Sequence, residues 1–248
     1  MEQDILFLIA AFGSVIIGTV AGFGSSTVLL PIALFFVDFK TAIILVVILH
    51  ISGNISKVTI FKQGLNWRIL AIFGIPSILL ALLGANLIDI IPQDIMKLIL
   101  GIFLIIFSAT TFLKPSVKIP DSKKNLVAGG SISGFLAGLI GTGGAVRASF
   151  LTGLNLEKFT YIATAASIAL VTDATRIPVY ISQGFLEEQY YWYIPVLIGI
   201  AVSGSFLGKK IVNRVDNILF RKIVSAAIIL ASLKFVGDGV AFLGSFVD

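Results

Sequence analysis

The sequence contains no cysteine, a single histidine and few charged residues, which make up 12% of its 248 residues. The lack of cysteine excludes disulfide bonds, thiolate metal sites and cysteine nucleophiles. Soluble domains carry about a quarter charged residues, so this chain lacks the polar surface that keeps a domain dissolved. One histidine is too few for a histidine-rich metal site, and no phosphate-loop or nucleophile-elbow motif is present. We therefore expect neither an enzyme nor a protein that holds a metal or other cofactor.

Hydrophobic residues make up 57% of the sequence, and most of them fall in long apolar runs. Several runs approach the roughly 20 residues that a helix needs to cross about 30 Å of hydrocarbon. They cover residues 5–20, 28–37, 43–55, 69–88, 95–113, 146–154, 162–171 and 192–207. Barrel strands alternate apolar and polar residues, whereas residues 98–106 are apolar throughout. The pattern predicts an all-α, multi-pass protein of the cell membrane, surrounded by lipid.

The net charge of +5 does not indicate nucleic acid as a partner. The basic residues lie in short segments between the apolar runs, a distribution typical of membrane orientation signals. We expect the basic segments near residues 57–68, 114–124 and 209–222 to be cytoplasmic. The acidic or weakly charged segments near residues 2–4, 38–40, 89–97, 187–188 and 238–248 should then be external. The first run follows acidic residues, not a basic patch, and is therefore not expected to be a cleaved signal peptide.

Four short blocks recur in the same order in the two halves of the chain. Residues 19–27 resemble 136–144, and 54–57 align with 173–176. Phe61 matches Tyr180, and the pair at 75–76 matches that at 194–195. The repetition predicts one membrane repeat over 1–113 and a second over 126–248. A cytoplasmic linker over 114–125, which has two prolines and four lysines, joins them.

Charges in equivalent loops indicate that the two repeats are inverted. Segment 62–68 is basic, whereas its counterpart 183–189 contains two glutamates; segment 89–97 is weakly charged, whereas 209–222 is strongly basic. Inversion requires an odd number of segments in each half. A glycine-broken first element that forms a hairpin, followed by three transmembrane helices, satisfies this. We expect about eight to ten helical segments with both termini outside; a parallel eight-helix arrangement is the alternative.

Glycine-rich stretches interrupt the first element of each half, at residues 22–27 and 138–144. Glycine costs about 1 kcal/mol in a helix interior, and non-helical backbone in lipid leaves polar groups unsatisfied. Paired breaks at corresponding positions therefore indicate a transport site, where each new half-helix directs free N–H groups and a positive dipole end at the substrate. Close helix packing is the alternative role for these glycines. The expected substrate-binding residues of the breaks are Gly24, Ser25, Ser26, Thr27, Gly141, Thr142, Gly143 and Gly144.

Arg147 follows the second break by about one turn and lies between apolar neighbours. An ionisable group inside a membrane helix is costly and indicates a functional site. Its guanidinium is a planar fork that suits sulfonate, carboxylate or phosphate oxygens. We therefore include Arg147 in the predicted binding site. The alternatives are a side chain that reaches an interface and a structural pair with an acid.

Five further polar residues are candidates for coupling or gating. His50, Asn54 and Lys57 share one helix face, and Asp173 and Arg176 repeat this arrangement in the second half. His50 can bind and release protons near neutral pH, so it is a candidate for coupling transport to a proton gradient. Packing is the alternative role for His50, and mutual neutralisation is the alternative for Asp173 and Arg176.

The glycine-rich blocks at 21–26 (Ala-Gly-Phe-Gly-Ser-Ser) and 137–144 resemble the TauE/SafE sulfite-exporter-like family, as do segments 62–68 and 176–184. The similarity extends over essentially the whole chain. It implies transport of sulfite, of sulfonates such as sulfoacetate, or of other organosulfur or carboxylate anions. In the first half, Gly-Ser-Ser-Thr replaces a glycine-rich run. That half-site is therefore expected to present more hydroxyl groups than is usual in the family.

The favoured function is a secondary transporter of sulfite or a small organosulfonate. One bundle would rock against the other around the two breaks and so alternate access between the two sides. A passive anion channel and a non-transporting membrane scaffold are the alternatives. The sequence leaves open the particular anion, the direction of transport and the formation of a homo-oligomer.

Overall fold

The computed structural model describes residues 2–21, 24–61, 64–113, 119–211 and 217–245. These ranges form α-helices and one short 3-10 helix, with no strand among them, so the all-α prediction is confirmed. In chain order the elements are α1 (Glu2–Ala21), α2 (Ser25–Ala33), α3 (Phe39–Ile60), α4 (Trp67–Leu87), α5 (Gln93–Leu113), α6 (Lys123–Ile140), α7 (Gly144–Thr152), α8 (Lys158–Ser182), η2 (Glu188–Tyr190), α9 (Tyr193–Ile211) and α10 (Asn217–Gly244).

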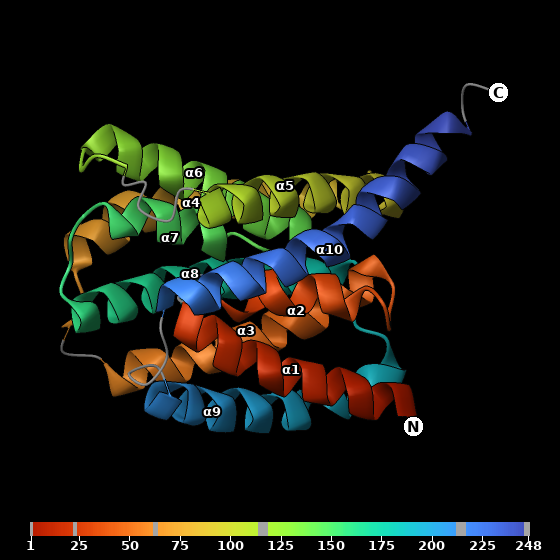
Figure 1. The fold of residues 1–248 in the computed structure, drawn as a ribbon, viewed down its shortest axis with the longest axis horizontal. Helices are drawn as coiled ribbons and strands as arrows, with labels where there is room; N and C mark the ends of the chain where they lie inside the picture. Colours follow the sequence, from red (N-terminus) through yellow and green to blue (C-terminus); the bar gives the residue numbers. More distant parts are fainter. Residues whose placement is uncertain (1, 22–23, 62–63, 114–118, 212–216, 246–248) are drawn as a thin grey trace.

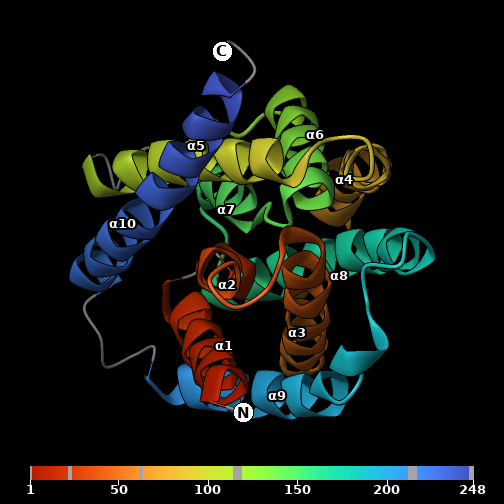
Figure 2. The same ribbon diagram turned by 90° about the vertical axis from the view of Figure 1, so that its right-hand side faces the viewer.

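Seven of these helices are long and apolar enough to cross a membrane, namely α1, α3, α4, α5, α8, α9 and α10. They lie roughly along the long axis of the molecule (Figure 1). The two nine-residue helices, α2 and α7, are too short to span and lie near the centre of the bundle when it is viewed from its end (Figure 2). The predicted multi-pass membrane protein is thus confirmed, with a short helix after each glycine-rich break.

Polar side chains at the helix starts explain several boundaries. Asp38 accepts hydrogen bonds from the backbone N–H groups of Lys40 and Thr41 at the start of α3, and Asn66 accepts one from Ile69 at the start of α4. Ser122 accepts from Asn125 in the same way, so α6 begins at Lys123 and the last three residues of the predicted linker are helical. Such caps satisfy donors that have no partner within the helix. Residues 114–118 of the linker lie outside the described ranges.

Each half of the chain contributes five α-helices in the same order, α1–α5 and α6–α10. The packing repeats as well, because α4 packs against α6 and α8, while its counterpart α9 packs against α1 and α3. Phe61, after the end of α3, stacks on Phe159 at the start of α8, and Lys40 at the start of α3 contacts Phe185 beyond the end of α8. Helices α3 and α8 therefore run in opposite directions. The inversion of the two halves stays a prediction, which this packing supports.

Glycines on one face of α6 bring that helix into close contact with α4. Gly130, Gly134 and Gly138 are spaced by four residues, so they form a stripe, and their Cα atoms lie against the backbone of Phe73, Ser77 and Ala81. A Cβ added at Gly134 or Gly138 would clash with a backbone oxygen of α4. The predicted break therefore begins later than the sequence indicates. Helix α6 continues to Ile140, and Gly138 serves close packing rather than the break.

Replacing Gly134 with valine should strongly destabilise the protein, because the new side chain would meet the backbone of Ser77, which has no flexible end to move aside. We expect a loss of about 3 kcal/mol or more in the free energy of unfolding, at the upper end for overpacked cores. Thermal unfolding in detergent would measure it. Gly13→Val in α1 is the matched control, because nothing lies within 4 Å of a Cβ added at Gly13. Equal melting temperatures for the two variants would contradict the close-packing role.

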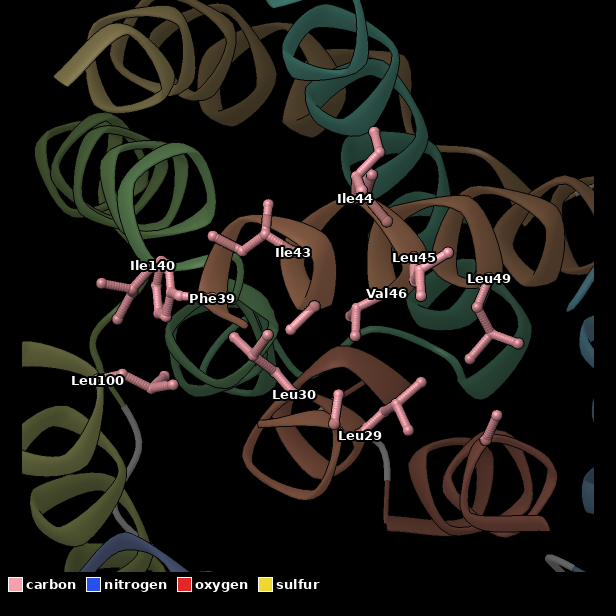
Figure 3. Packing of buried hydrophobic residues seen from close by; sticks show 14 of the residues in the cluster. Leu29, Leu30, Phe39, Ile43, Ile44, Leu45, Val46, Leu49, Leu100 and Ile140 are labelled. Carbon is pink, nitrogen blue, oxygen red and sulfur yellow. The ribbon is translucent and has the colours of Figure 1, made fainter. Parts of the chain in front are cut away.

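An apolar core fills the space between α2 and α3. Leu29 and Leu30 of α2 lie against Ile43, Val46 and Leu49 of α3 (Figure 3), and all five side chains are at most 1% exposed. Ile140, at the end of α6, belongs to the same cluster.

Candidate functional site

The two glycine-rich breaks meet at the centre of the molecule. Helix α2 begins after Gly24, whose φ of 91° is a conformation that favours glycine, and α7 begins at Gly144. A Cβ at Gly24 would lie 3.9 Å from the Cα of Gly144. The hydroxyl groups of Thr27 and Thr142 are 2.9 Å apart and share a hydrogen bond. Residues 22–23, at the start of the first break, lie outside the described ranges.

Neither short helix has a side-chain cap among the described residues. The first N–H groups of a helix have no partner within it, and they lie at the positive end of its dipole. Gly24 and Gly144 line a cavity of about 260 Å³. Two helix starts without a side-chain cap therefore border the same cavity.

The cavity brings together six of the residues predicted from the sequence, from the start of α2, from α3 and from α7. Besides the two glycines, Arg147 of α7 lines its wall, and so do His50, Asn54 and Lys57 along one face of α3. The three α3 residues all line the cavity because they lie on one face of the helix, as the sequence predicts.

The remaining predicted binding residues build the breaks and do not line the cavity. Gly141 ends α6 with a φ of 75°, and the hydroxyl group of Ser133 donates to the carbonyl of Gly143 over 2.8 Å. The Thr27–Thr142 hydrogen bond joins the two breaks in a fully buried position. The predicted residues outside the cavity wall are Ser25, Ser26, Thr27, Gly141, Thr142 and Gly143.

Positive charge dominates the cavity. Arg147 is only 7% exposed, yet among the described residues its guanidinium forms no hydrogen bond or salt bridge, and Lys57 forms none either. The cavity wall contains no aspartate or glutamate in the part of the chain that the structure describes. Buried charges are normally paired, because removing a charge from water is costly. The arrangement therefore suits an anionic ligand.

Two buried polar side chains add neutral hydrogen-bonding groups to the same wall. Asn54 and Ser205 are each 3% exposed, and the amide nitrogen of Asn54 and the hydroxyl oxygen of Ser205 have no hydrogen-bond partner among the described residues. Buried polar atoms are rarely left without a partner. These two atoms are therefore placed to bind a polar ligand or water in the cavity.

A chain of buried polar groups extends from the cavity into the closed side of the bundle. His50 Nδ1 lies 2.7 Å from Asp173 Oδ2, and Arg176 donates from Nε and Nη2 to the other oxygen of Asp173 over 3.0 and 2.8 Å. Asp173 and Arg176 do not line the cavity. The predicted pairing between them is present as a salt bridge.

Arg176 and Tyr180 hold the end of α6. Arg176 Nη1 donates to the carbonyl of Ala137, and the hydroxyl group of Tyr180 donates to that of Gly138 over 2.6 Å. The last carbonyl groups of a helix lack partners within it and lie at the negative end of its dipole. A buried cation and a hydroxyl donor thus satisfy the broken end of α6.

A family model described as Sulfite exporter TauE/SafE matches residues 6–235. The chain belongs to the TauE/SafE family. A curated relative, described as a probable membrane transporter protein of Methanocaldococcus jannaschii, is 26% identical over 239 residues, which cover 85% of this chain and 87% of the relative. The resemblance noted in the sequence is thereby confirmed, and this TauE/SafE chain is a multi-pass membrane transporter.

Sequence reasoning missed the residues at the mouth of the cavity in this TauE/SafE chain. Lys158 and Phe159, at the start of α8, and Lys209, near the end of α9, line the wall and are exposed. Lys209 lies over the ring of Phe61, 5.3 Å from its centroid. Ser205, one turn before Lys209, was missed as well. None of the four stands out from the sequence around it. The contact of α8 with α3 brings Lys158 and Phe159 to the cavity, and the contact of α9 with α3 brings Ser205 and Lys209 there.

Proposed function

We propose that this TauE/SafE chain carries sulfite, a small organosulfonate or a similar organic anion across the membrane by alternating access. The observation that carries the proposal is a cavity with two cations that have no salt-bridge partner among the described residues, and with two helix starts that have no side-chain cap there. Backbone N–H groups at a helix start and an arginine fork both bind oxyanions. The cavity of about 260 Å³ is somewhat smaller than the roughly 300–1,000 Å³ of drug-sized sites, as expected for a small ligand.

The exposed residues of the cavity wall mark its opening. Its outer part includes the exposed residues Lys158, Phe159 and Lys209, and Lys209 belongs to a segment that the charge distribution predicts to be cytoplasmic. On the opposite side, the apolar core around Ile43 and Leu30 fills the space. This asymmetry supports an inward-open state of a carrier.

Equivalent contacts in the two halves differ in a way that supports alternating access. In the second half, Arg176 and Tyr180 of α8 bind the last turn of α6. Their equivalents by sequence alignment, Lys57 and Phe61, line the cavity together with Gly18 of the last turn of α1. The contact between α8 and α6 is thus closed, while the equivalent residues of α3 and α1 lie on the wall of the cavity. If the α3–α1 contact formed and the α8–α6 contact broke, the present cavity would close and an equivalent cavity would open on the external side.

Ligand-dependent stability tests the proposal. A ligand that binds only the folded protein raises its free energy of unfolding by about 2.7 kcal/mol at one hundred times its dissociation constant. We expect sulfite, methanesulfonate or sulfoacetate to raise the melting temperature of the purified protein, while choline and tetramethylammonium salts of a shared non-binding anion leave it unchanged. Absence of stabilisation by every anion tested would contradict the proposal.

Flux into proteoliposomes distinguishes the carrier from the channel and the scaffold. A carrier shows saturable uptake and accelerated exchange when unlabelled anion is loaded on the far side, whereas a channel conducts ohmic current. A scaffold shows neither flux nor ligand-dependent stabilisation. Saturable exchange of the stabilising anion is the expected result.

A further inference from the structure

We infer that His50 holds a proton that binds together with the transported anion, and that Asp173 is the residue that positions this proton. The inference rests on the proposed anion function and adds a second, co-bound ligand to it. The supporting observation is the position of the imidazole. Its Nδ1 forms a hydrogen bond with the buried carboxylate of Asp173, and its Nε2 lies near Gly24 at the cavity.

The hydrogen bonds around Asp173 show which nitrogen of His50 carries a hydrogen in the neutral ring. One carboxylate oxygen accepts two hydrogen bonds from Arg176, and the other lies 2.7 Å from His50 Nδ1. An ionised carboxylate only accepts hydrogen bonds, so Nδ1 must carry a hydrogen and donate it. In the neutral imidazole the other nitrogen, Nε2, then has a lone pair and no hydrogen.

Nε2 is the atom of His50 nearest the meeting point of the two breaks. It would lie 3.5 Å from a Cβ added at Gly24, a residue that lines the cavity with His50 itself. A lone pair at this position repels the oxygen of an oxyanion. Protonation converts Nε2 into a donor and makes it a third type of anion-binding group, beside Arg147 and the helix starts. An ionised oxyanion therefore binds at this position most favourably when His50 is charged.

The charged groups around His50 couple proton binding to anion binding. Helix α8 presents Asp173 and Arg176, which form a salt bridge with each other, and Lys158 and Tyr161, which line the cavity wall. Arg147 of α7 and Lys57 of α3 face the cavity without a salt bridge to any described residue. Lys209 of α9 lies further out at the mouth, and in α5 Asp94 and Lys97 pair with each other near the start of α3. The described parts of α1 and α2 contribute no titratable group to the cavity wall.

An imidazolium at His50 is repelled by Arg147 and Lys57 when the cavity has no anion, and a bound anion compensates that repulsion. Each ligand therefore raises the affinity for the other, and the two factors are equal by thermodynamic linkage. For a monovalent sulfonate, the anion and the proton together add no net charge to the site. A carrier that moves both in one step would link the anion gradient to the proton gradient.

Methanesulfonate is the appropriate probe, because it stays ionised over the whole pH range of interest, whereas sulfite titrates near neutral pH. We expect its dissociation constant to rise with pH, approaching tenfold per unit above the pKa of His50 in the anion-free protein. Calorimetric titrations in buffers with different enthalpies of ionisation should show uptake approaching one proton per anion at the alkaline end of the range.

Two variants assign the proton to His50 and its positioning to Asp173. His50→Gln retains an amide donor that does not titrate, so methanesulfonate should bind with an affinity that no longer changes with pH and without proton uptake. Asp173→Asn can donate to Nδ1 and thereby favours the other tautomer, so its pH profile should shift while sulfonate binding remains. Unliganded melting temperatures report on the fold of each variant.

The outcomes separate this inference from the proposed function. Binding of methanesulfonate with a pH-independent affinity and no proton uptake overturns the co-bound proton and leaves the anion carrier standing. Retention of the full pH slope in a folded His50→Gln variant places the proton elsewhere and also overturns the inference. Failure of every anion to bind the parent protein counts against the proposed function itself.

Discussion

Replacing Arg147 with glutamine should weaken anion binding about 100-fold, a loss of about 3 kcal/mol, while the protein stays folded. Charge-assisted hydrogen bonds from a fork to an oxyanion are among the strongest that a protein makes, and glutamine provides only a neutral donor. The fold should survive, because Arg147 forms no salt bridge with any described residue. Its removal therefore leaves no buried acid without a partner, which is what makes the loss of a paired buried charge so costly.

Isothermal titration with methanesulfonate would measure this effect, with two companion variants. Arg147→Lys keeps the charge but loses the planar fork, so an intermediate loss of about tenfold is expected. Arg68→Gln, at the exposed start of α4, removes the same charge outside the cavity and should bind like the parent protein. Parent-like affinity in Arg147→Gln would show that Arg147 lies beside the anion without binding it.

The sequence was a good guide to the helices and to the breaks because both are local patterns. Apolar runs specify spanning helices by length, and paired glycines mark interrupted backbone, so α2 and α7 appear where the breaks were expected. Arg147 was identifiable because a charge in an apolar segment is costly anywhere in a membrane. These features need no knowledge of which helices are neighbours.

The composition of the cavity wall depends on neighbours, and the sequence predicted it less well. The hydroxyl groups of Thr27 and Thr142 were expected to bind substrate, and this stays a prediction. In the structure they form a hydrogen bond with each other, because the starts of the two half-helices meet. Ser205 and Lys209 reach the cavity only through the packing of α9 on α3. In helices that are apolar all round, hydrophobic periodicity does not mark the face that meets a partner.

The partial symmetry of the two halves predicts how one side opens when the other closes. Tyr180→Phe removes the hydroxyl group that donates to the carbonyl of Gly138, so the closed contact between α8 and α6 loses a buried hydrogen bond. Leaving a buried acceptor unsatisfied costs about 1–3 kcal/mol, which changes the ratio of the two states about 5- to 150-fold. We expect the variant to shift toward the outward-open state.

Phe61→Tyr tests the same equilibrium from the other side. Phe61 aligns with Tyr180 and lines the open cavity beside the last turn of α1. A hydroxyl group there should donate to a carbonyl of α1 once that contact closes, and so stabilise the outward-open state directly. Because the two substitutions act on different contacts, their effects on the equilibrium should add in the double variant.

Single cysteines report the shift, since the parent chain has none. Ser205→Cys lines the present cavity, while Ala169→Cys, at the position on α8 that aligns with His50, is 1% exposed. Labelling at Ala169→Cys by an impermeant thiol reagent from the external side should increase in both variants, and labelling at Ser205→Cys from the cytoplasmic side should decrease. If labelling changed at neither position, the proposed switch between the two contacts would be refuted. A hydrogen bond that closes one side must break when that side opens, so removing it must favour opening.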